Sequence, residues 1–152
     1  MKVAVIGHRL VKITPILSIA TSIDVQGLVE EGADRFCFAF GGALTDICLD
    51  VINELKEYYD IKRVYYRAVY TDEKDAVSDY FASFFEKKYF DESVSKTGVD
   101  GINERYRFMI DDCDVLLTLY DPQIEKSKTA AAVAYAKKNG KRIINVLDLL
   151  KK

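Results

Sequence analysis

Five short apolar runs, each separated from the next by a stretch with helical features, constrain the fold of this chain most. Residues 3–6, 36–40, 62–70, 115–120 and 142–146 form these runs. Near-continuous apolar strands that alternate with helices are typical of a parallel sheet covered on both faces. The pattern therefore predicts an α/β fold, a three-layer αβα Rossmann-like domain with a mostly parallel sheet of about five strands.

The stretches between the runs carry the spacing and the end signals of helices. We expect helices over about residues 15–31, 45–58, 73–88, 101–111 and 128–139, and one helical turn at 147–152. In the first helix, apolar positions fall near one stripe, and Gly32 is placed to end it. Either Thr45 or Asp46 is expected to cap the second. The stripe of the first helix comprises Ile16, Ile19, Ile23, Gln26 and Val29, and the third helix is expected to bury Tyr80, Phe81, Phe84 and Phe85.

Length and composition exclude several classes of protein. The 152 residues fit one domain, residues 1–152. A net charge of −2 argues against nucleic acid as a partner. No apolar run approaches the roughly 18 residues of a membrane span, and the N-terminus leads directly into a strand, so we expect no membrane association.

The cysteines and the histidine bear on location and on metal binding. Cys37, Cys48 and Cys113 are odd in number, far apart and embedded in apolar runs, which favours buried thiols in a reduced cytoplasmic protein. With no two cysteines at ligand spacing and one histidine in all, we predict no metal site and no cofactor.

Polar residues and glycines follow the predicted strands where each strand ends. Since the carboxyl ends of parallel strands share one edge of the sheet, these residues are expected to converge on a ligand crevice there. Glycines permit close backbone approach, and a helix N-terminus favours phosphate or carboxylate. The residues are Gly7, His8 and Arg9, then Gly41, Gly42 and Asp46, then Asp121, Ser127, Lys128 and Thr129, and finally Asn145.

Each of these features also has a structural interpretation. Gly41-Gly42 serves equally well as a tight turn without a ligand, and Ser127-Lys128-Thr129 as a plain N-cap. Arg105 suits bidentate phosphate recognition but also a solvated helix face. His8 is either a ligand contact or an organiser of its loop. The aspartates Asp111, Asp112 and Asp114 fit a solvated turn more simply than a Mg²⁺ site.

Five segments in order resemble the SLOG superfamily of Rossmann-like nucleotide-binding proteins, which groups the DprA/Smf domain, YpsA-like proteins and LOG proteins. The segments are VAVIGHR, FAFGGALTD, IKRVYYRAVY, ERYRFMIDDCDVLLTLYD and SKTAAAVAYAKKNGKRIIN. The resemblance covers nearly the whole chain and is greatest to the small single-domain, DUF1273-like members. Dimers are common in the superfamily, so it also allows a homo-oligomer.

The resemblance implies a nucleotide or nucleotide-derived ligand at two anion-binding turns. Carried over by position, it implicates Gly7, His8 and Arg9, then Gly41, Gly42 and Asp46, then Arg105, Ser127 and Thr129. Two departures concern these turns. The family loop reads like GGxGxFD, whereas GGALTD lacks the third glycine, and a lysine replaces the middle glycine of the usual GGT or SGT.

Three functions follow from the resemblance. The first, which we favour, is a nucleotide-binding or sensing domain without chemistry of its own. The second is a LOG-like hydrolase of an N-glycosidic bond, in a nucleoside monophosphate or an ADP-ribose-like ligand, with Asp46 as its catalytic carboxylate and Arg105 nearby. The third is a degenerate relative that acts through protein–protein contacts. A nucleotide site predicts that one crevice is bordered by His8, Gly41, Gly42, Arg105 and Thr129.

Overall fold

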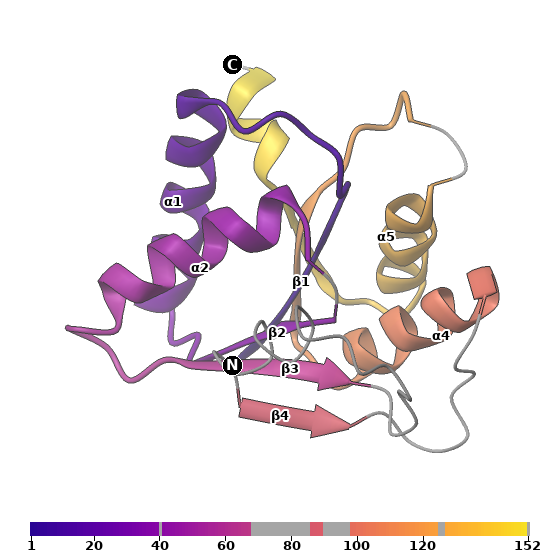
Figure 1. The fold of residues 1–152 in the computed structure, drawn as a ribbon, viewed down its shortest axis with the longest axis horizontal. Helices are drawn as coiled ribbons and strands as arrows, with labels where there is room; N and C mark the ends of the chain where they lie inside the picture. The colour runs from indigo at the N-terminus through magenta and orange to yellow at the C-terminus, as the bar shows by residue number, and fades with distance from the viewer. Residues whose placement is uncertain (40, 68–85, 90–97, 125–126, 152) are drawn as a thin grey trace, which may run out of the picture.

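A wholly parallel sheet runs through the computed structural model, which describes residues 1–39, 41–67, 86–89, 98–124 and 127–151 (Figure 1). Within these residues the sheet has six strands in the order β4-β3-β2-β1-β5-β6. The strands are β1 (Lys2–Gly7), β2 (Arg35–Phe38), β3 (Lys62–Arg67), β4 (Glu86–Tyr89), β5 (Val115–Leu119) and β6 (Arg142–Asn145). The helices are α1 (Pro15–Glu30), α2 (Ala43–Leu55), α4 (Gly98–Asp111), α5 (Lys128–Lys138) and the 3-10 helix η1 (Val146–Lys151).

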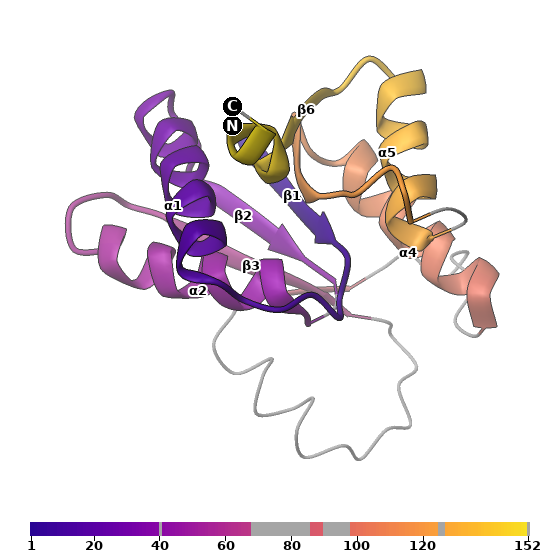
Figure 2. The same cartoon turned by 90° about the horizontal axis from the view of Figure 1, so that it is seen from above.

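Helices cover the two faces of the sheet as separate layers. Helices α1, α2 and η1 lie on one face, and α4 and α5 lie on the other (Figures 1 and 2). Successive side chains of a strand point to opposite faces. Accordingly, Val3 and Val5 of β1 join the buried cluster under α1 and α2, whereas Ala4 and Ile6 join the cluster under α4 and α5. The predicted three-layer αβα fold is confirmed.

The sheet agrees with the prediction of about five strands, and β4 extends it beside β3 as a strand that was not predicted. Its residues Glu86, Lys87 and Lys88 belong to the end of the helix predicted over 73–88. β4 is an edge strand of sequence EKKY, and charged residues are common on edge strands, so no apolar run marks it. The rest of the predicted helix, with Tyr80, Phe81, Phe84 and Phe85, lies outside the described residues.

The buried face of α1 differs from the predicted stripe. Of the predicted stripe, Val29 is buried, but Gln26 is exposed and Ile16, Ile19 and Ile23 are 64, 60 and 57% exposed. The other buried residues of the helix are Leu17, Ala20, Thr21, Val25 and Leu28. The helix is apolar on two sides, so its periodicity does not specify which side is buried. Its ends lie where expected, from Pro15 to a stop before Gly32, which has φ +110°. The Thr14 hydroxyl, which the sequence analysis did not single out, caps the helix by accepting a hydrogen bond from the Leu17 amide at 3.2 Å.

The described part of the chain holds no helix whose length and apolar character would let it cross a membrane.

A half-buried carboxylate on α1, that of Asp24, makes stability depend on pH. Burial, and secondarily the charge of Asp148, raise the pKa of Asp24, and within the described residues its buried Oδ2 accepts no hydrogen bond. A pKa raised by folding means that the stabilisation present at acid pH is lost as pH rises through the folded-state value.

Asp24→Asn is therefore expected to stabilise the protein at pH 7, by about 0.5 kcal/mol because solvent partly screens the site. At pH 3, where the carboxyl is protonated in both states, the gain should vanish. Urea unfolding at the two pH values measures it, with exposed Asp60→Asn as the control. An equal gain at both pH values would contradict the assignment.

Candidate functional site

The strand order reverses between β1 and β5, and a crevice opens at that point. From β1 the chain adds β2, β3 and β4 towards one edge, whereas β5 and β6 lie on the other side. In open α/β sheets, ligands bind beside the carboxyl ends of strands at such a reversal. The crevice has a volume of about 450 Å³ and is lined by Gly7, His8, Arg9, Leu10, Ile102, Tyr106, Ile124, Ser127, Lys128 and Thr129.

His8 ties together the loops that leave β1 and β5. Its backbone amide donates to the Leu119 carbonyl at 3.0 Å, and its Nε2 accepts a hydrogen bond from the Asp121 amide at 2.9 Å. The side chain is buried, and its ring lies 5.9 Å from that of Tyr120. An accepting Nε2 places the proton of the neutral ring on Nδ1. His8 thus organises the loop while it lines the crevice.

Arg9 joins the loop after β1 to the glycine turn after β2. Its Nε donates to the Gly41 carbonyl at 3.2 Å, and its own carbonyl accepts from the Ala43 amide at 3.4 Å. Gly42 has φ +153°, and a Cβ there would lie 3.1 Å from the Arg9 Cα. The turn therefore requires glycine at this position for reasons of backbone geometry.

Helix α2 starts without a side-chain cap in the described structure, because its N-cap residue is Gly42. The predicted cap by Thr45 or Asp46 is wrong: both residues lie inside the helix, where their side chains are past the capping position. A small hollow at this helix start is lined by Gly41, Gly42 and Thr45, and it adjoins the crevice through the shared residues Gly7 and Tyr106.

Helix α5 points its N-terminus at the crevice. The Ser127 hydroxyl caps it by accepting from the Ala130 amide at 2.9 Å, while Thr129 is buried and Lys128 is half-buried. A helix N-terminus carries about half a positive charge, and the Lys128 ammonium adds to it. The two interpretations of the Ser127–Thr129 segment are compatible, since the capped helix start also lines the crevice.

From α4, Tyr106 and Ile102 line the crevice, whereas the sequence analysis named Arg105, the neighbour of Tyr106. Tyr106 and Ile102, one helical turn apart, both line it, whereas Arg105 is half-buried and is not among the lining residues. Burial raises the pKa of Tyr106, and the nearby charge of Arg9 opposes that shift. The apolar spacing of α4 places Tyr106 on the inward face, and that signal could have identified it.

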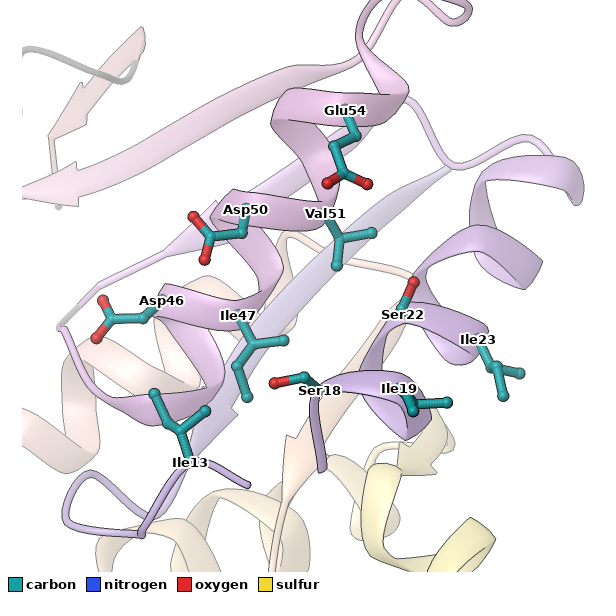
Figure 3. A pocket seen from close by; sticks show the side chains of 10 residues that line it. All are labelled: Ile13, Ser18, Ile19, Ser22, Ile23, Asp46, Ile47, Asp50, Val51 and Glu54. Carbon is teal, nitrogen blue, oxygen red and sulfur yellow. The ribbon is translucent and has the colours of Figure 1, made fainter. Parts of the chain in front are cut away.

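Asp46 belongs to a different region of the surface. It is exposed and lines a groove between α1 and α2, together with Asp50 and Glu54 (Figure 3). Burial, and then the charge of Asp50, raise its pKa. The structure thus gathers Gly7, His8, Arg9, Ser127 and Thr129 around one crevice, with Gly41 and Gly42 beside it. It does not bring Asp46 or Arg105 among the lining residues.

The aspartates near the end of α4 make structural contacts. Asp111 accepts from the Tyr135 hydroxyl at 2.7 Å, Asp112 pairs with the Lys2 ammonium at 3.6 Å, and Asp114 accepts from the Lys2 amide at 2.9 Å. In the part of the chain that the structure describes, no three His, Cys, Asp or Glu side chains cluster as metal ligands would.

Neither a protein-family model nor a curated protein sequence matches this chain. Solved structures with the same fold include DNA processing protein A from Helicobacter pylori, whose single-stranded DNA binding mode was the subject of that structure. It is 18% identical, with a TM-score of 0.64, over 94% of this chain and 63% of that one. DprA from Streptococcus pneumoniae is 12% identical, with a TM-score of 0.64, over 93% of this chain and 48% of that one.

TM1055 is 16% identical, with a TM-score of 0.56, over 93% of this chain and 71% of that one. This chain therefore spans less than two thirds of either DprA structure. At these identities the likeness shows the fold: the chain is a Rossmann-like α/β protein of the type found in DprA and TM1055.

Proposed function

We propose that the crevice between β1 and β5 binds a nucleotide or nucleotide-derived small molecule, and that this chain is a binding or sensing domain. The observation that carries the proposal is the meeting of two cationic side chains, Arg9 and Lys128, with the N-terminus of α5 at the reversal of strand order. Phosphate is the anion that such a combination favours.

The remaining lining supplies the apolar part of such a site. Tyr106, Ile102 and Ile124 line the same crevice as the cationic residues. An aromatic ring can stack on a base, while aliphatic side chains exclude water from it. The crevice thus offers both cationic and apolar residues, which a mononucleotide needs for its phosphate and its base.

The residues that line the crevice favour ligand binding without catalysis over hydrolysis of an N-glycosidic bond. Hydrolysis of an N-glycosidic bond needs a carboxylate near the anomeric carbon. Among the described residues that line the crevice there is neither aspartate nor glutamate, and Asp46 lines the other groove. The residue-by-residue SLOG resemblance supports nucleotide binding, and with it we propose a small single-domain, DUF1273-like SLOG protein. Its three free buried cysteines fit the reducing cytoplasm.

Thermal shift and calorimetric titration test the proposal. AMP, ADP-ribose, NAD and cyclic nucleotides are compared with adenosine, which lacks phosphate, and with an oligothymidine single strand. We expect at least one phosphorylated ligand to raise the melting temperature, with a stabilisation of about 2.7 kcal/mol at a hundredfold excess over Kd. No shift at millimolar concentration, or an equal shift with adenosine, would overturn it. Tighter binding of the oligonucleotide would assign the crevice to single strands.

Lys128→Gln is expected to weaken binding of the best phosphorylated ligand about tenfold, since a charged contact contributes roughly 1.5–3 kcal/mol. Lys137→Gln is the matched control, because Lys137 lies exposed in the last turn of the same helix, away from the crevice. Isothermal titration of both variants measures the difference. Equal affinities of the two variants would remove Lys128 from the site.

A further inference from the structure

Helix α1 exposes a second apolar face beside the groove that it forms with α2. Ile16, Ile19 and Ile23 recur at intervals of three and four residues and are more than half exposed, and Ile13 precedes them at 47% exposure. Single exposed isoleucines are ordinary, but a row of them along one helix face marks an interaction surface. We call these four residues the isoleucine row.

The groove itself is large enough to receive side chains of a partner. It has a volume of about 380 Å³, with Ile19 and Ile23 on the α1 side and Ile47 and Val51 on the α2 side (Figure 3). It belongs to the layer of α1 and α2, whereas the nucleotide crevice is lined by α4 and α5 in the other layer. The two sites can therefore be tested separately.

An acidic row borders this groove along α2. Asp46, Asp50 and Glu54 follow one another at intervals of four residues, so they share one helix face. Within the described residues none of the three forms an ion pair, and like charges at this spacing repel. The raised pKa of Asp46 reflects in part the charge of Asp50. Cations placed along the row would relieve this repulsion.

The charges argue against a second copy of this chain as the occupant. If α1 of another copy lay on the isoleucine row, it would bring only acidic side chains, Asp24 and Glu30, because residues Pro15–Glu30 contain no lysine or arginine. The acidic row would then stay uncompensated. The complementary occupant is a segment that carries apolar residues on one side and cations on the next.

We propose that the α1–α2 groove docks a basic amphipathic helix of another protein. Its apolar side lies on the isoleucine row, and its lysine or arginine residues face Asp46, Asp50 and Glu54. The isoleucine row and the acidic row each present a side chain every three or four residues of their own helix. A docked helix presents the side chains of one face at the same spacing, so it can match both rows.

Fluorescence anisotropy with labelled peptides tests this docking. The probe is a helical peptide of about 18 residues, roughly 27 Å long, with leucines on one face and lysines at intervals of four beside them. One control peptide has glutamate in place of lysine, and another has the same composition in scrambled order. We expect the lysine peptide to bind at least about tenfold more tightly than either control. Equal binding of the three peptides would overturn the proposal.

Paired variants locate the binding on the protein. The double variants Ile19→Ser/Ile23→Ser and Asp50→Asn/Glu54→Gln are each expected to weaken binding of the lysine peptide at least about tenfold. The controls Tyr58→Ser and Glu57→Gln alter exposed residues that do not line the groove and should leave affinity unchanged. Unchanged affinity in both double variants would refute the proposal.

Salt dependence and oligomeric state distinguish a basic helix from a second copy of this chain as the occupant of the groove. Raising NaCl from about 0.05 to 0.5 M should weaken the wild-type complex more than that of Asp50→Asn/Glu54→Gln, because salt screens charge pairs. Sedimentation velocity that shows a dimer lost in Ile19→Ser/Ile23→Ser would assign the groove to a second copy and refute the proposal. Lys128 lines the nucleotide crevice and not the groove, so Lys128→Gln should not change peptide binding. The peptide experiment therefore tests the docking proposal even if the crevice binds no nucleotide.

Discussion

Asn145→Ala is expected to lower the free energy of unfolding by about 2–3 kcal/mol. The Asn145 amide makes three hydrogen bonds at the end of β6: its Nδ2 donates to the Tyr120 carbonyl at 2.7 Å, and its Oδ1 accepts from the Tyr120 and Leu147 amides at 3.2 Å each. Each partly buried bond contributes about 1 kcal/mol, and alanine replaces none of them. Tyr120 would also lose its link to β6 where the chain leaves β5.

Asn139→Ala is the matched control for this effect. The Asn139 side chain makes one exposed hydrogen bond, from Nδ2 to the Tyr135 carbonyl at 2.8 Å. Its loss should lower the free energy of unfolding by less than about 1 kcal/mol. Urea unfolding measures both variants, with the midpoint as readout and the slope as a check on two-state behaviour. Equal losses in the two variants would show that the hydrogen bonds of Asn145 contribute no more than an exposed one.

Asn145 also illustrates what the sequence could and could not predict. Its place near the end of a predicted strand puts it correctly at the carboxyl edge of the sheet, because apolar runs indicate where buried strands end. Its role in holding Tyr120 depends on β5 and β6 being neighbours. Strand order is a tertiary property that no local pattern encodes. The same holds for His8, whose partner Asp121 lies 113 residues further along the chain.

Helix faces were predictable only where apolar residues occupy a single side. On α4 the apolar residues Tyr106, Met109 and Ile110 share one face and are buried, since charged residues fill the opposite side. On α1, isoleucines and leucines surround the helix, and the three isoleucines of the predicted stripe face outward while its Val29 is buried. Burial there is decided by which face meets the sheet. The isoleucines that were expected in the core instead lie on the surface, where they form most of the isoleucine row.

For the site, too, the sequence predicted the residues at strand ends but not the direction of side chains on helices. Junction residues such as Gly7, Arg9 and Thr129 were placed correctly at one crevice, since parallel strands bring their carboxyl ends together. Asp46 was expected there because it follows a strand and Arg105 because guanidinium suits phosphate, and the resemblance implicated both, but none of these signals specifies which way a helix residue points. One residue of offset along a helix turns a side chain by about 100°, which separates Arg105 from Tyr106.

Gly42→Ala is expected to lower the free energy of unfolding by about 2–3 kcal/mol. The residue has φ +153°, a conformation that residues with a Cβ rarely adopt, and the added methyl carbon would lie 3.1 Å from the Arg9 Cα. That neighbour is backbone, so it can give way only by moving the loop after β1. Both the stability and the shape of the crevice should therefore change.

Gly41→Ala separates folding from ligand approach, because the same methyl group there meets no atom within 4 Å and needs no positive φ. Its stability should lie within about 0.5 kcal/mol of wild type. If the phosphate of the best nucleotide ligand contacts this turn, however, the methyl group should still weaken binding, by about tenfold or more. Urea unfolding and calorimetric titration of both variants test this. Wild-type stability of Gly42→Ala would contradict the turn geometry, and wild-type affinity of Gly41→Ala would place the phosphate elsewhere, at the start of α5.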